Sequence, residues 1–447
     1  MKINSYVLFL SLVAALGGFL FGFDTAVISG AERQIQELWS LSDWSHGLAI
    51  AIALYGTVIG ALFGGIPADK YGRKTSLIWI GILFFVSALG SAIAPEIYSF
   101  MFFRFIGGLG VGASSVVAPM YISEISPAKN RGQLVALYQF NLVFGILMAY
   151  LSNYLIDLNI QTNSWRWMLG MEAIPALIYT LLVFRVPLSP RWLIAKKDDF
   201  ENAERILTRT DPEGVEEAVR LAIEEKKLNK AQVGFMALFN RKYIKITLLA
   251  ILIALFNQLS GINAIIYFAP RIFDMAGISA ESALLSTVGI GVTNIIATML
   301  GLFLIDRIGR KKLMYIGSFG YIISLLLIAY SFSGAQINNT FLPIFVFMFI
   351  ASHAVGQGAV IWVFISEIFP NELRAHGQSM GCFTHWILAA IIANVFPLMA
   401  NQFGPVVIFG FFALMMVLQL IWVFTKMPET KGRSLEEIQQ EFIKDHG

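Results

Sequence analysis

The sequence predicts an all-α integral membrane protein with twelve transmembrane helices, six on each side of a charged central segment. Of its 447 residues, 57% are hydrophobic and 14% are charged, whereas roughly 25% are charged in an ordinary soluble domain. The polarity is also concentrated, because residues 191–245 hold 22 of the 61 charged side chains. Long apolar stretches fill the rest of the chain, and two sets of loop motifs occur twice. These observations argue against a soluble fold.

Each spanning helix needs about 20 mostly apolar residues, because the backbone rises about 1.5 Å per residue and must satisfy its own hydrogen bonds in the hydrocarbon core. The first apolar stretch continues past Leu20 toward Gly30, so we expect an uncleaved helix and no signal peptide. The uncharged run at 313–366 is too long for one crossing and breaks near Gly334. The expected spans are 6–30, 47–67, 75–95, 98–121, 133–156, 168–187, 244–268, 283–305, 313–333, 342–365, 377–399 and 405–426.

The short loops indicate the orientation of the chain. Ten Lys and Arg residues lie in loops assigned to the cytoplasm, and three, Arg33, Arg166 and Arg271, lie in the opposite loops. By the positive-inside rule both termini and the central segment are expected in the cytoplasm. Stretches 201–207 and 216–227 of that segment are expected to form short amphipathic helices. The expected division is an N-terminal six-helix half at 1–187, a cytoplasmic helical linker at 188–243, a C-terminal six-helix half at 244–427 and a short cytoplasmic tail at 428–447.

Several functions are disfavoured by composition. The net charge of +3 is spread over short loops, so nucleic-acid binding is not expected. Cys382 is the single cysteine and has no metal-ligand cluster around it. The glycines at 107–112 lie inside a spanning segment with no preceding strand, which favours helix packing over a nucleotide-binding loop. We therefore expect no enzyme, no catalytic residue, no metal and no cofactor, and nothing in the sequence requires more than a monomer.

Two loop motifs each occur in both halves. GIPADKYGRK at 65–74 follows the second expected span, and GLFLIDRIGRK at 301–311 follows the eighth. SEISP at 123–127 and SEIFP at 366–370 follow the fourth and the tenth. Repeats of whole six-helix units are the architecture of a transporter that rocks around a central site.

These motifs resemble the major facilitator superfamily, specifically its sugar porter family, over essentially the whole chain. The resemblance also rests on Arg104 and on GFDTAVISG at 22–30, PLSPRWL at 187–193, QLSGIN at 258–263 and PETKG at 428–432. The chain looks like bacterial proton-coupled sugar symporters such as the xylose transporter and, more distantly, like facilitative glucose carriers. The resemblance implies the major facilitator fold with pseudo-symmetric halves, and a place in the bacterial inner membrane.

Asp24 and Arg104 are expected to form an ion pair within the membrane. A charged side chain in a spanning helix costs about 2.5–3.5 kcal/mol, so it needs a partner. Asp24 lies six residues before Gly30 on an outward-running helix, and Arg104 lies six residues after Tyr98 on an inward-running one. Both are thus about 9 Å below the outer surface. Protonation of Asp24 would free Arg104 and couple protons to transport, and the resemblance implies the same role. A purely structural salt bridge is the alternative.

A sugar site is expected among amide and aromatic side chains, because sugar hydroxyls both donate and accept hydrogen bonds. By resemblance, four of the candidates match sugar-contacting positions: Gln139, Gln258, Asn263 and Trp362. The full set of candidates is Gln139, Asn257, Gln258, Asn263, Asn294, Trp362, His385 and Trp386.

This chain departs from the family pattern at several positions, two of them in the expected sugar site. Asn257 stands where the family usually has Gln, and His385 stands where it has Gln or Asn. His385 could bond a hydroxyl, titrate near neutral pH or merely pack. Gly358-Ala359 replaces the usual Gly-Pro, which removes a proline kink, and Leu188 replaces a glutamate. The resemblance admits glucose, xylose, galactose, arabinose or inositol as the cargo.

Matched charges at the cytoplasmic helix ends are expected to form a gate. Acid-to-Arg pairs at these ends could clamp the outward-open state, although they could also serve as topology signals alone. The residues are Asp69, Arg73, Glu124, Arg131, Asp306, Arg310, Glu367 and Arg374.

The sequence therefore predicts a secondary active transporter that carries a hexose or pentose together with protons across the cytoplasmic membrane by alternating access. A facilitative uniporter, in which Asp24 is only structural, is the first alternative. A non-transporting sugar sensor is a further one. Such a sensor would be expected to carry a long signalling tail, whereas about 20 residues follow the last expected span.

Overall fold

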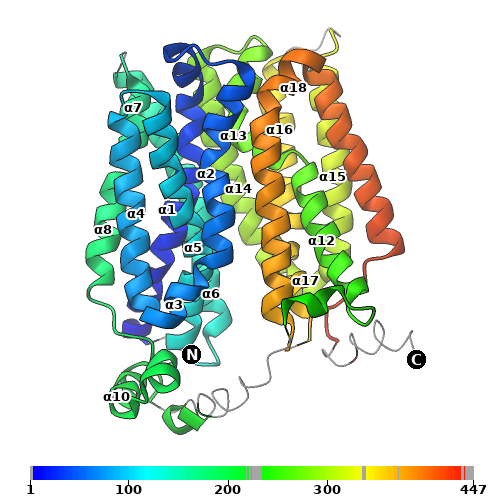
Figure 1. Ribbon diagram of the computed structural model, residues 1–447. Coiled ribbons are helices and arrows are strands. Elements are labelled where there is room, and N and C mark those ends of the chain that lie inside the picture. Colours follow the sequence, from blue (N-terminus) through cyan, green and yellow to red (C-terminus); the bar gives the residue numbers. More distant parts are fainter. Residues whose placement is uncertain are drawn as a thin grey trace. The chain divides into compact units, whose positions relative to one another are not determined.

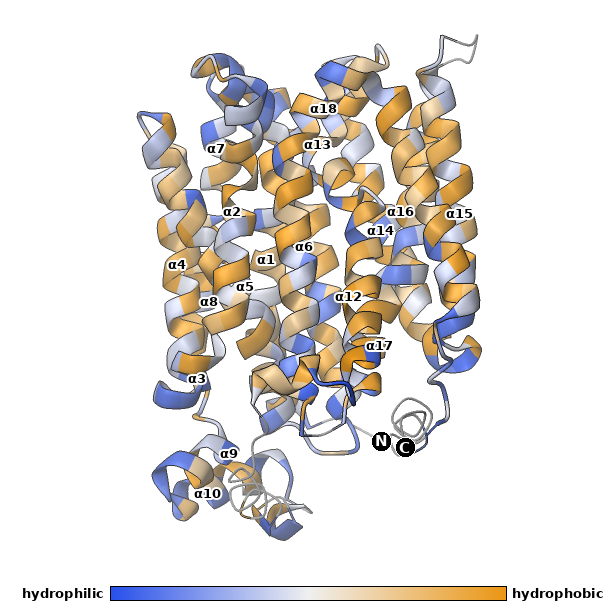
Figure 2. Cartoon of the chain, turned by 45° about the vertical axis from the view of Figure 1, so that its right-hand side comes forward, coloured by the Kyte–Doolittle hydropathy of each residue, from blue (hydrophilic) through white to orange (hydrophobic). Residues whose placement is uncertain are grey.

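The computed structural model describes residues 4–160, 162–212, 214–217, 219–220, 223, 234–334, 339–370, 372–433 and 437 (Figure 1). All regular secondary structure in these residues is helical. Within them, 11 segments are long and apolar enough to cross a membrane. Figure 2 shows hydrophobic residues along most of the length of the long helices, with hydrophilic residues at many helix ends and around α10. The predicted membrane-spanning character is confirmed.

The helices that precede the charged segment are α1 (Ser5–Leu38), α2 (Asp43–Phe63), α3 (Gly65–Tyr71), α4 (Arg73–Ile93), α5 (Ile97–Ile125), α6 (Arg131–Asn159), α7 (Ser164–Gly170) and α8 (Ala173–Val183). Those of the charged segment are α9 (Pro190–Trp192), η1 (Leu193–Lys197), α10 (Phe200–Thr210) and η2 (Phe235–Phe239). Those that follow are α12 (Ile244–Leu259), α13 (Ile262–Met275), α14 (Ala280–Ile308), α15 (Arg310–Ser331), η3 (Asn339–Phe341), α16 (Leu342–His353), η4 (Ala354–Gly358), α17 (Ala359–Ile368) and α18 (Arg374–Thr425).

The last two predicted spans form one continuous segment, α18, with a break at Gly404. Its 52 residues would make a straight helix of about 78 Å, more than twice the thickness of a hydrocarbon core. Gly404 has φ +75° and ψ 161°, which are not helical, and Pro405 follows it. Glycine tolerates this positive φ because it has no Cβ. Each of the twelve predicted spans therefore overlaps one of the 11 segments, and the last two share α18.

The tenth predicted span contains a π-helical turn near the position where the proline kink is missing. It runs through α16, η4 and α17, and η4 is a π-helical turn of five residues, Ala354–Gly358. The buried side chain of Gln357 in this turn donates a hydrogen bond to Gln419 of α18. Where the family's Gly-Pro is absent, the helix thus carries a widened turn immediately before Ala359.

The charged segment begins with a small folded unit. Trp192, Leu193, Ile194 and Ala203 pack into a buried cluster, and the Trp192 indole donates to the Asp69 backbone oxygen over 3.0 Å. Asp199 caps α10, and its hydrogen bonds with Asn202 lower the pKa of its carboxyl. The predicted helix at 201–207 is confirmed as part of α10. The predicted helix at 216–227 falls largely outside the described residues.

Contacts divide the chain into two compact units. The first comprises Met1–Val27, Tyr55–Ala149 and Arg166–Gln232, and the second comprises Ile28–Leu54, Tyr150–Trp165 and Val233–Gly447. One end of each of α1, α2 and α6 therefore belongs to the same unit as α12 to α18. The expected boundaries at 187/188, 243/244 and 427/428 stay predictions.

Within the first unit, glycines allow α1 and α6 to approach closely. A Cβ on Gly22 would lie 1.9 Å from the Leu142 backbone oxygen, and one on Gly145 would lie 2.1 Å from the Phe19 oxygen. In membranes such small residues replace the hydrophobic effect as the means of bringing helices together, because lipid is as apolar as the side chains.

Gly22→Ala is therefore expected to destabilise the folded protein by about 1–3 kcal/mol, because the added methyl group overpacks a backbone contact. A thermal unfolding curve in detergent, followed by size-exclusion chromatography, measures the loss. Gly410→Ala is the matched control, since a Cβ there meets no atom within 4 Å. Equal midpoints for the two variants would contradict the close-packing interpretation.

Candidate functional site

Asp24 and Arg104 meet inside the first unit. The Arg104 Nη1 lies 2.5 Å from the Asp24 Oδ1, and its Nη2 lies 3.3 Å from the Asp24 backbone oxygen. The side chains come from α1 and α5 and are almost completely buried, with residue exposures of 2% and 1%. A buried pair of opposite charges in this setting is stable only while both partners remain in place.

Glu172, which the sequence reasoning missed, joins this pair. It immediately precedes α8, is 1% exposed and interacts electrostatically with both Asp24 and Arg104. Among the described residues its Oε1 has no hydrogen-bond partner. Two carboxyl groups thus face one guanidinium, so this acid cluster is electrically neutral only when it holds one proton. An acid inside an apolar span was the signal that identified Asp24, and it applies equally to Glu172 in the expected span 168–187.

An amide–histidine cluster lies in the second unit. The Gln258 Nε2 donates to the Asn257 Oδ1 over 3.0 Å and lies 3.1 Å from the His385 Nδ1. The Asn263 Nδ2 donates to the Gln258 Oε1 over 2.6 Å. The span 244–275 is interrupted between α12 and α13 at Gly261, whose φ of +83° favours glycine. Asn257 and Gln258 lie before this interruption and Asn263 lies after it, and α18 supplies His385.

Two tryptophans flank the histidine. The His385 ring lies 5.0 Å from the Trp362 ring and 4.7 Å from the Trp386 ring, measured between centroids. Trp362 is 36% exposed, whereas Trp386 is 7% exposed. Partly open aromatic faces beside satisfied amides can accept the apolar face of a sugar ring while the amides exchange their hydrogen bonds for its hydroxyls.

The other two candidate sugar residues lie on α14 and α6. Asn294 accepts a hydrogen bond from Thr298, one turn along the same helix α14, over 3.3 Å. Gln139 lies on α6 within the first unit and is half-buried.

At the motif 65–74 of the first unit, Arg73 links two acids. Its Nη1 lies 2.9 Å from the Asp69 Oδ1, and its Nε lies 3.0 Å from the Glu124 Oε1. Ser189 donates a further hydrogen bond to Glu124. The cluster therefore joins α3, α4 and α5 to the start of the charged segment.

The second unit repeats this arrangement. The Arg310 guanidinium lies 3.0 Å from the Asp306 Oδ1 and binds Glu367 through two bonds of 2.7 Å and 3.1 Å. Thr430 donates to Glu367 over 2.6 Å, and Glu429 accepts from the backbone nitrogen of Arg310 at the start of α15 over 3.0 Å. Ser189, Glu429 and Thr430 were missed, although all three lie in motifs that carried the resemblance.

Arg131 and Arg374 contribute less to these clusters. Among the residues that the structure describes, the buried Nε atoms of both lack a hydrogen-bond partner. The ion pairs found in the two clusters are those of the triads of Asp69, Arg73 and Glu124 and of Asp306, Arg310 and Glu367.

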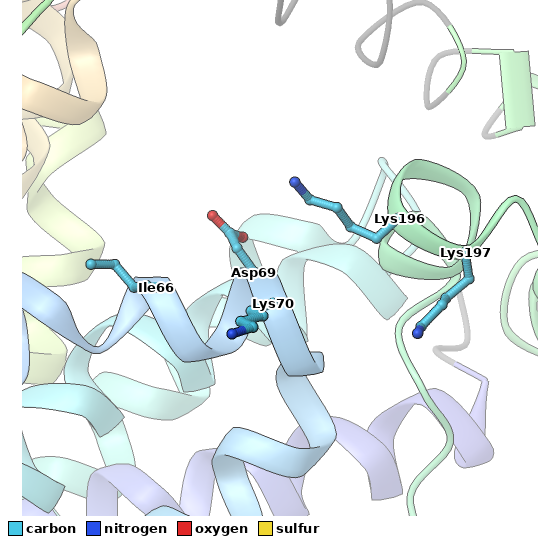
Figure 3. A pocket seen from close by; sticks show the side chains of 5 residues that line it. All are labelled: Ile66, Asp69, Lys70, Lys196 and Lys197. Atoms are coloured by element: carbon cyan, nitrogen blue, oxygen red, sulfur yellow. The ribbon is translucent and has the colours of Figure 1, made fainter.

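An open cavity of about 430 Å³ lies next to the first triad. It is lined by Ile66, Asp69, Lys70, Lys196 and Lys197. In Figure 3, Asp69 on α3 and Lys196 on η1 reach into the same open space. None of the candidate sugar residues lines it.

Comparisons with known proteins agree with this architecture. Residues 10–442 match the family described as sugar (and other) transporter. The chain is 38% identical to the arabinose-proton symporter of Bacillus subtilis, covering 98% of this chain and 96% of that one. It is 33% identical to the D-xylose-proton symporter of Escherichia coli, with coverage of 98% and 96%.

Among solved structures, the inward-open xylose transporter of Escherichia coli superposes with a TM-score of 0.86 and 32% identity, covering 98% of this chain and 100% of that one. A proton:xylose symporter of the major facilitator superfamily bound to 6-bromo-6-deoxy-D-glucose superposes with a TM-score of 0.82 and 32% identity, covering 99% and 100%. The fold is therefore the major facilitator fold. Since the family match extends over nearly the whole sequence and these relatives exceed 30% identity, the chain belongs to the sugar transporter family.

Proposed function

We propose that the protein is a secondary active transporter that carries a monosaccharide together with protons across the cell membrane by alternating access. The observation that supports this most directly is the buried acid cluster of Asp24, Glu172 and Arg104. A passive carrier gains nothing from two carboxyl groups and one cation in an apolar span, because such groups are costly there. Relatives named as arabinose-proton and xylose-proton symporters support the same function.

The cluster offers a physical means of coupling. With Asp24 ionised, the Arg104 guanidinium is bound to it at 2.5 Å. When Asp24 is protonated, the attraction weakens and Arg104 is free to pair with Glu172. A proton thereby changes which partner Arg104 prefers, and it biases the equilibrium between two arrangements of the surrounding helices.

The amide–histidine cluster is proposed to bind the sugar. Its amides are hydrogen-bonded to one another, so a sugar must replace these bonds with equivalent ones, and an analogue that lacks a hydroxyl leaves an amide unpaired. Trp362 and Trp386 are proposed as aromatic faces for the ring. Asn294 and Gln139 remain proposed contacts. Hydrogen bonding to a hydroxyl is the role that we propose for His385.

The two cytoplasmic triads are proposed to form the gate on the inner side, with Arg131 and Arg374 at its edge. The matched pairs hold the ends of helices that are distant in sequence, so their breakage would free those ends to move. This proposal places both termini in the cytoplasm and the protein, as a monomer, in the bacterial inner membrane.

Sugar-driven alkalinisation tests the proposed function. Sugar is added to a weakly buffered suspension of vesicles that contain the protein, and the external pH is recorded. A symporter removes protons from the medium with the sugar, so the pH rises. Uptake without a pH change would indicate a uniporter, and binding without uptake would indicate a sensor. A counterflow panel with glucose, xylose, galactose, arabinose and inositol identifies the cargo.

Gln258→Ala and Asn263→Ala are each expected to weaken sugar binding by about 1–3 kcal/mol through the loss of buried hydrogen bonds, which is about 5- to 150-fold in Kd. Isothermal titration with the sugar identified by counterflow measures the change. Asn159→Ala is a matched amide control, because Asn159 is exposed and bonds within its own helix. Unchanged dissociation constants for both cluster variants would show that the sugar binds elsewhere.

A further inference from the structure

A second buried charge cluster lies in the second unit, at the end of α1 and α2 expected to face outside. The His46 Nε2 lies 2.9 Å from the Glu32 Oε2, and the Arg271 guanidinium binds the same carboxylate through bonds of 3.0 Å and 2.8 Å. Glu32 is 1% exposed and His46 is 0% exposed. One carboxylate from α1 thus holds a histidine from α2 and an arginine from α13.

This cluster was missed because the expected spans ended too early. The first was expected to end at 30 and the second to begin at 47, which assigned Glu32 and His46 to an external loop. In the structure α1 continues to Leu38 and α2 begins at Asp43. Hydropathy detects only the apolar part of a helix, so it did not detect the polar turns that carry Glu32 and His46.

The contacts of His46 determine its protonation in this arrangement. Its Nε2 faces two acceptors, the Glu32 carboxylate and the Glu32 backbone oxygen at 3.1 Å, so this nitrogen carries a proton. Among the described residues its buried Nδ1 has no hydrogen-bond partner. A second proton on Nδ1 would place two cations, His46 and Arg271, against one buried carboxylate. The His46 and Phe268 rings pack edge to face, 6.0 Å apart between centroids. Phe268 carries no negative charge that could balance a second cation.

The other polar and charged groups near the cluster are already engaged. The Gln36 side chain accepts from Arg271 over 2.5 Å. Its amide nitrogen lies 3.5 Å from an oxygen of Asp43, at the start of α2. Arg33 binds Asp274 on α13 at 2.6 Å and Glu37 at 3.2 Å, all three with exposed side chains. The groups that face Glu32 directly are therefore His46 and Arg271.

We propose that His46 is a second proton-binding site, in which an external proton and the Arg271 guanidinium compete for the Glu32 carboxylate. With Arg271 bound, the cluster is neutral while His46 is neutral. When α13 draws Arg271 away, Glu32 and His46 stay together because a short turn joins α1 and α2. A proton from external water then binds the Nδ1 and restores neutrality. Acid outside thus favours separation of α13 from α1 and α2.

The functional meaning of this effect rests on the proposed function, because a pH-dependent opening matters for transport only if the outer end opens to admit a sugar. An external gate that opens with one bound proton would ready the carrier under the conditions in which a proton-driven symporter works. The gate is distinct from the acid cluster at Asp24, which lies in the first unit.

Distance measurements between spin labels test the proposal. Labels are placed at Leu38→Cys on α1 and Met275→Cys on α13, two exposed positions, in a Cys382→Ser, Asp24→Asn background that removes the native thiol and the ionisable Asp24. Double electron–electron resonance is recorded at pH 8 and pH 5. The population with the longer distance is expected to grow relative to the population with the shorter distance as the pH falls. The ratio of the two populations should rise by up to about tenfold per pH unit, because one proton is bound.

The variants separate the gate from a merely structural contact. His46→Gln retains a donor to Glu32 but does not titrate, so the pH response should disappear. Arg271→Gln should give the longer distance at both pH values, and it decides the question if His46→Gln does not fold. His376→Gln, at the other end of the second unit beside Phe235, should keep the response. A response that persists in His46→Gln, or its absence from the parent, would overturn the proposal. The distance measurement does not depend on coupled transport of sugar and protons. A failure of the proposed symport function would therefore appear in the alkalinisation assay and not in these distances.

Discussion

Asp24→Asn is expected to abolish uphill sugar accumulation while exchange and downhill flux persist. Asparagine keeps the shape of the side chain and can still accept a hydrogen bond from Arg104, but it neither carries a charge nor takes up a proton. The carrier would then pass between its states without a proton, so a pH gradient no longer drives the sugar. Uptake of labelled sugar into vesicles measures uphill accumulation when a pH gradient is imposed and downhill flux when it is not.

Asp198→Asn provides the matched control for this variant. Asp198 is exposed and has φ +55°, a left-handed conformation that asparagine also tolerates, so accumulation should equal that of the parent. Concentrative uptake preserved in Asp24→Asn would reject the role of Asp24 in coupling and leave it a structural partner of Arg104.

Arg104→Gln is expected to destabilise the protein by about 3–5 kcal/mol, because it leaves buried carboxyl groups without their cation. Asp24 and Glu172 would then face each other in an apolar setting. Thermal unfolding in detergent at pH 8 should show a large fall in the midpoint, and transport should be lost with it.

A second substitution tests the origin of this loss. If the fall reflects uncompensated charge, adding Asp24→Asn to Arg104→Gln should restore much of the stability, because one of the two repelling acids is removed. Independent, additive losses in the double variant would contradict a shared charge cluster. The effect would then reflect packing of the long arginine side chain instead.

The fold was predictable because the membrane demands helices of a certain length. Twelve apolar stretches and two duplicated motifs were enough to predict the architecture, and even the break between the last two spans lies within one residue of where Gly404 interrupts α18. The helix ends were less predictable. Hydropathy does not register the polar turns that extend α1 to Leu38.

The site was predictable only in part, because its contacts depend on packing between distant segments. Gln258 and His385 are separated by 127 positions, and no spacing rule indicates that their side chains meet. Glu172 shows the same sequence feature as Asp24, namely an acid within an apolar span. It was not identified because it lies near the expected end of a helix. Asn294 has a suitable side chain, yet its hydrogen bond remains within α14.

The wide turn η4 connects two distant parts of the second unit. One extra residue in a turn rotates everything that follows by about 100° about the helix axis, since an α-helix has 3.6 residues per turn. Trp362, beside His385, and Glu367, bound to Arg310, both follow this turn on α17. Tightening the turn to ordinary α-helical geometry would swing both side chains around together. The extra residue in η4 thus sets the orientation of both Trp362 and Glu367, so the position of one cannot change by this means without the other.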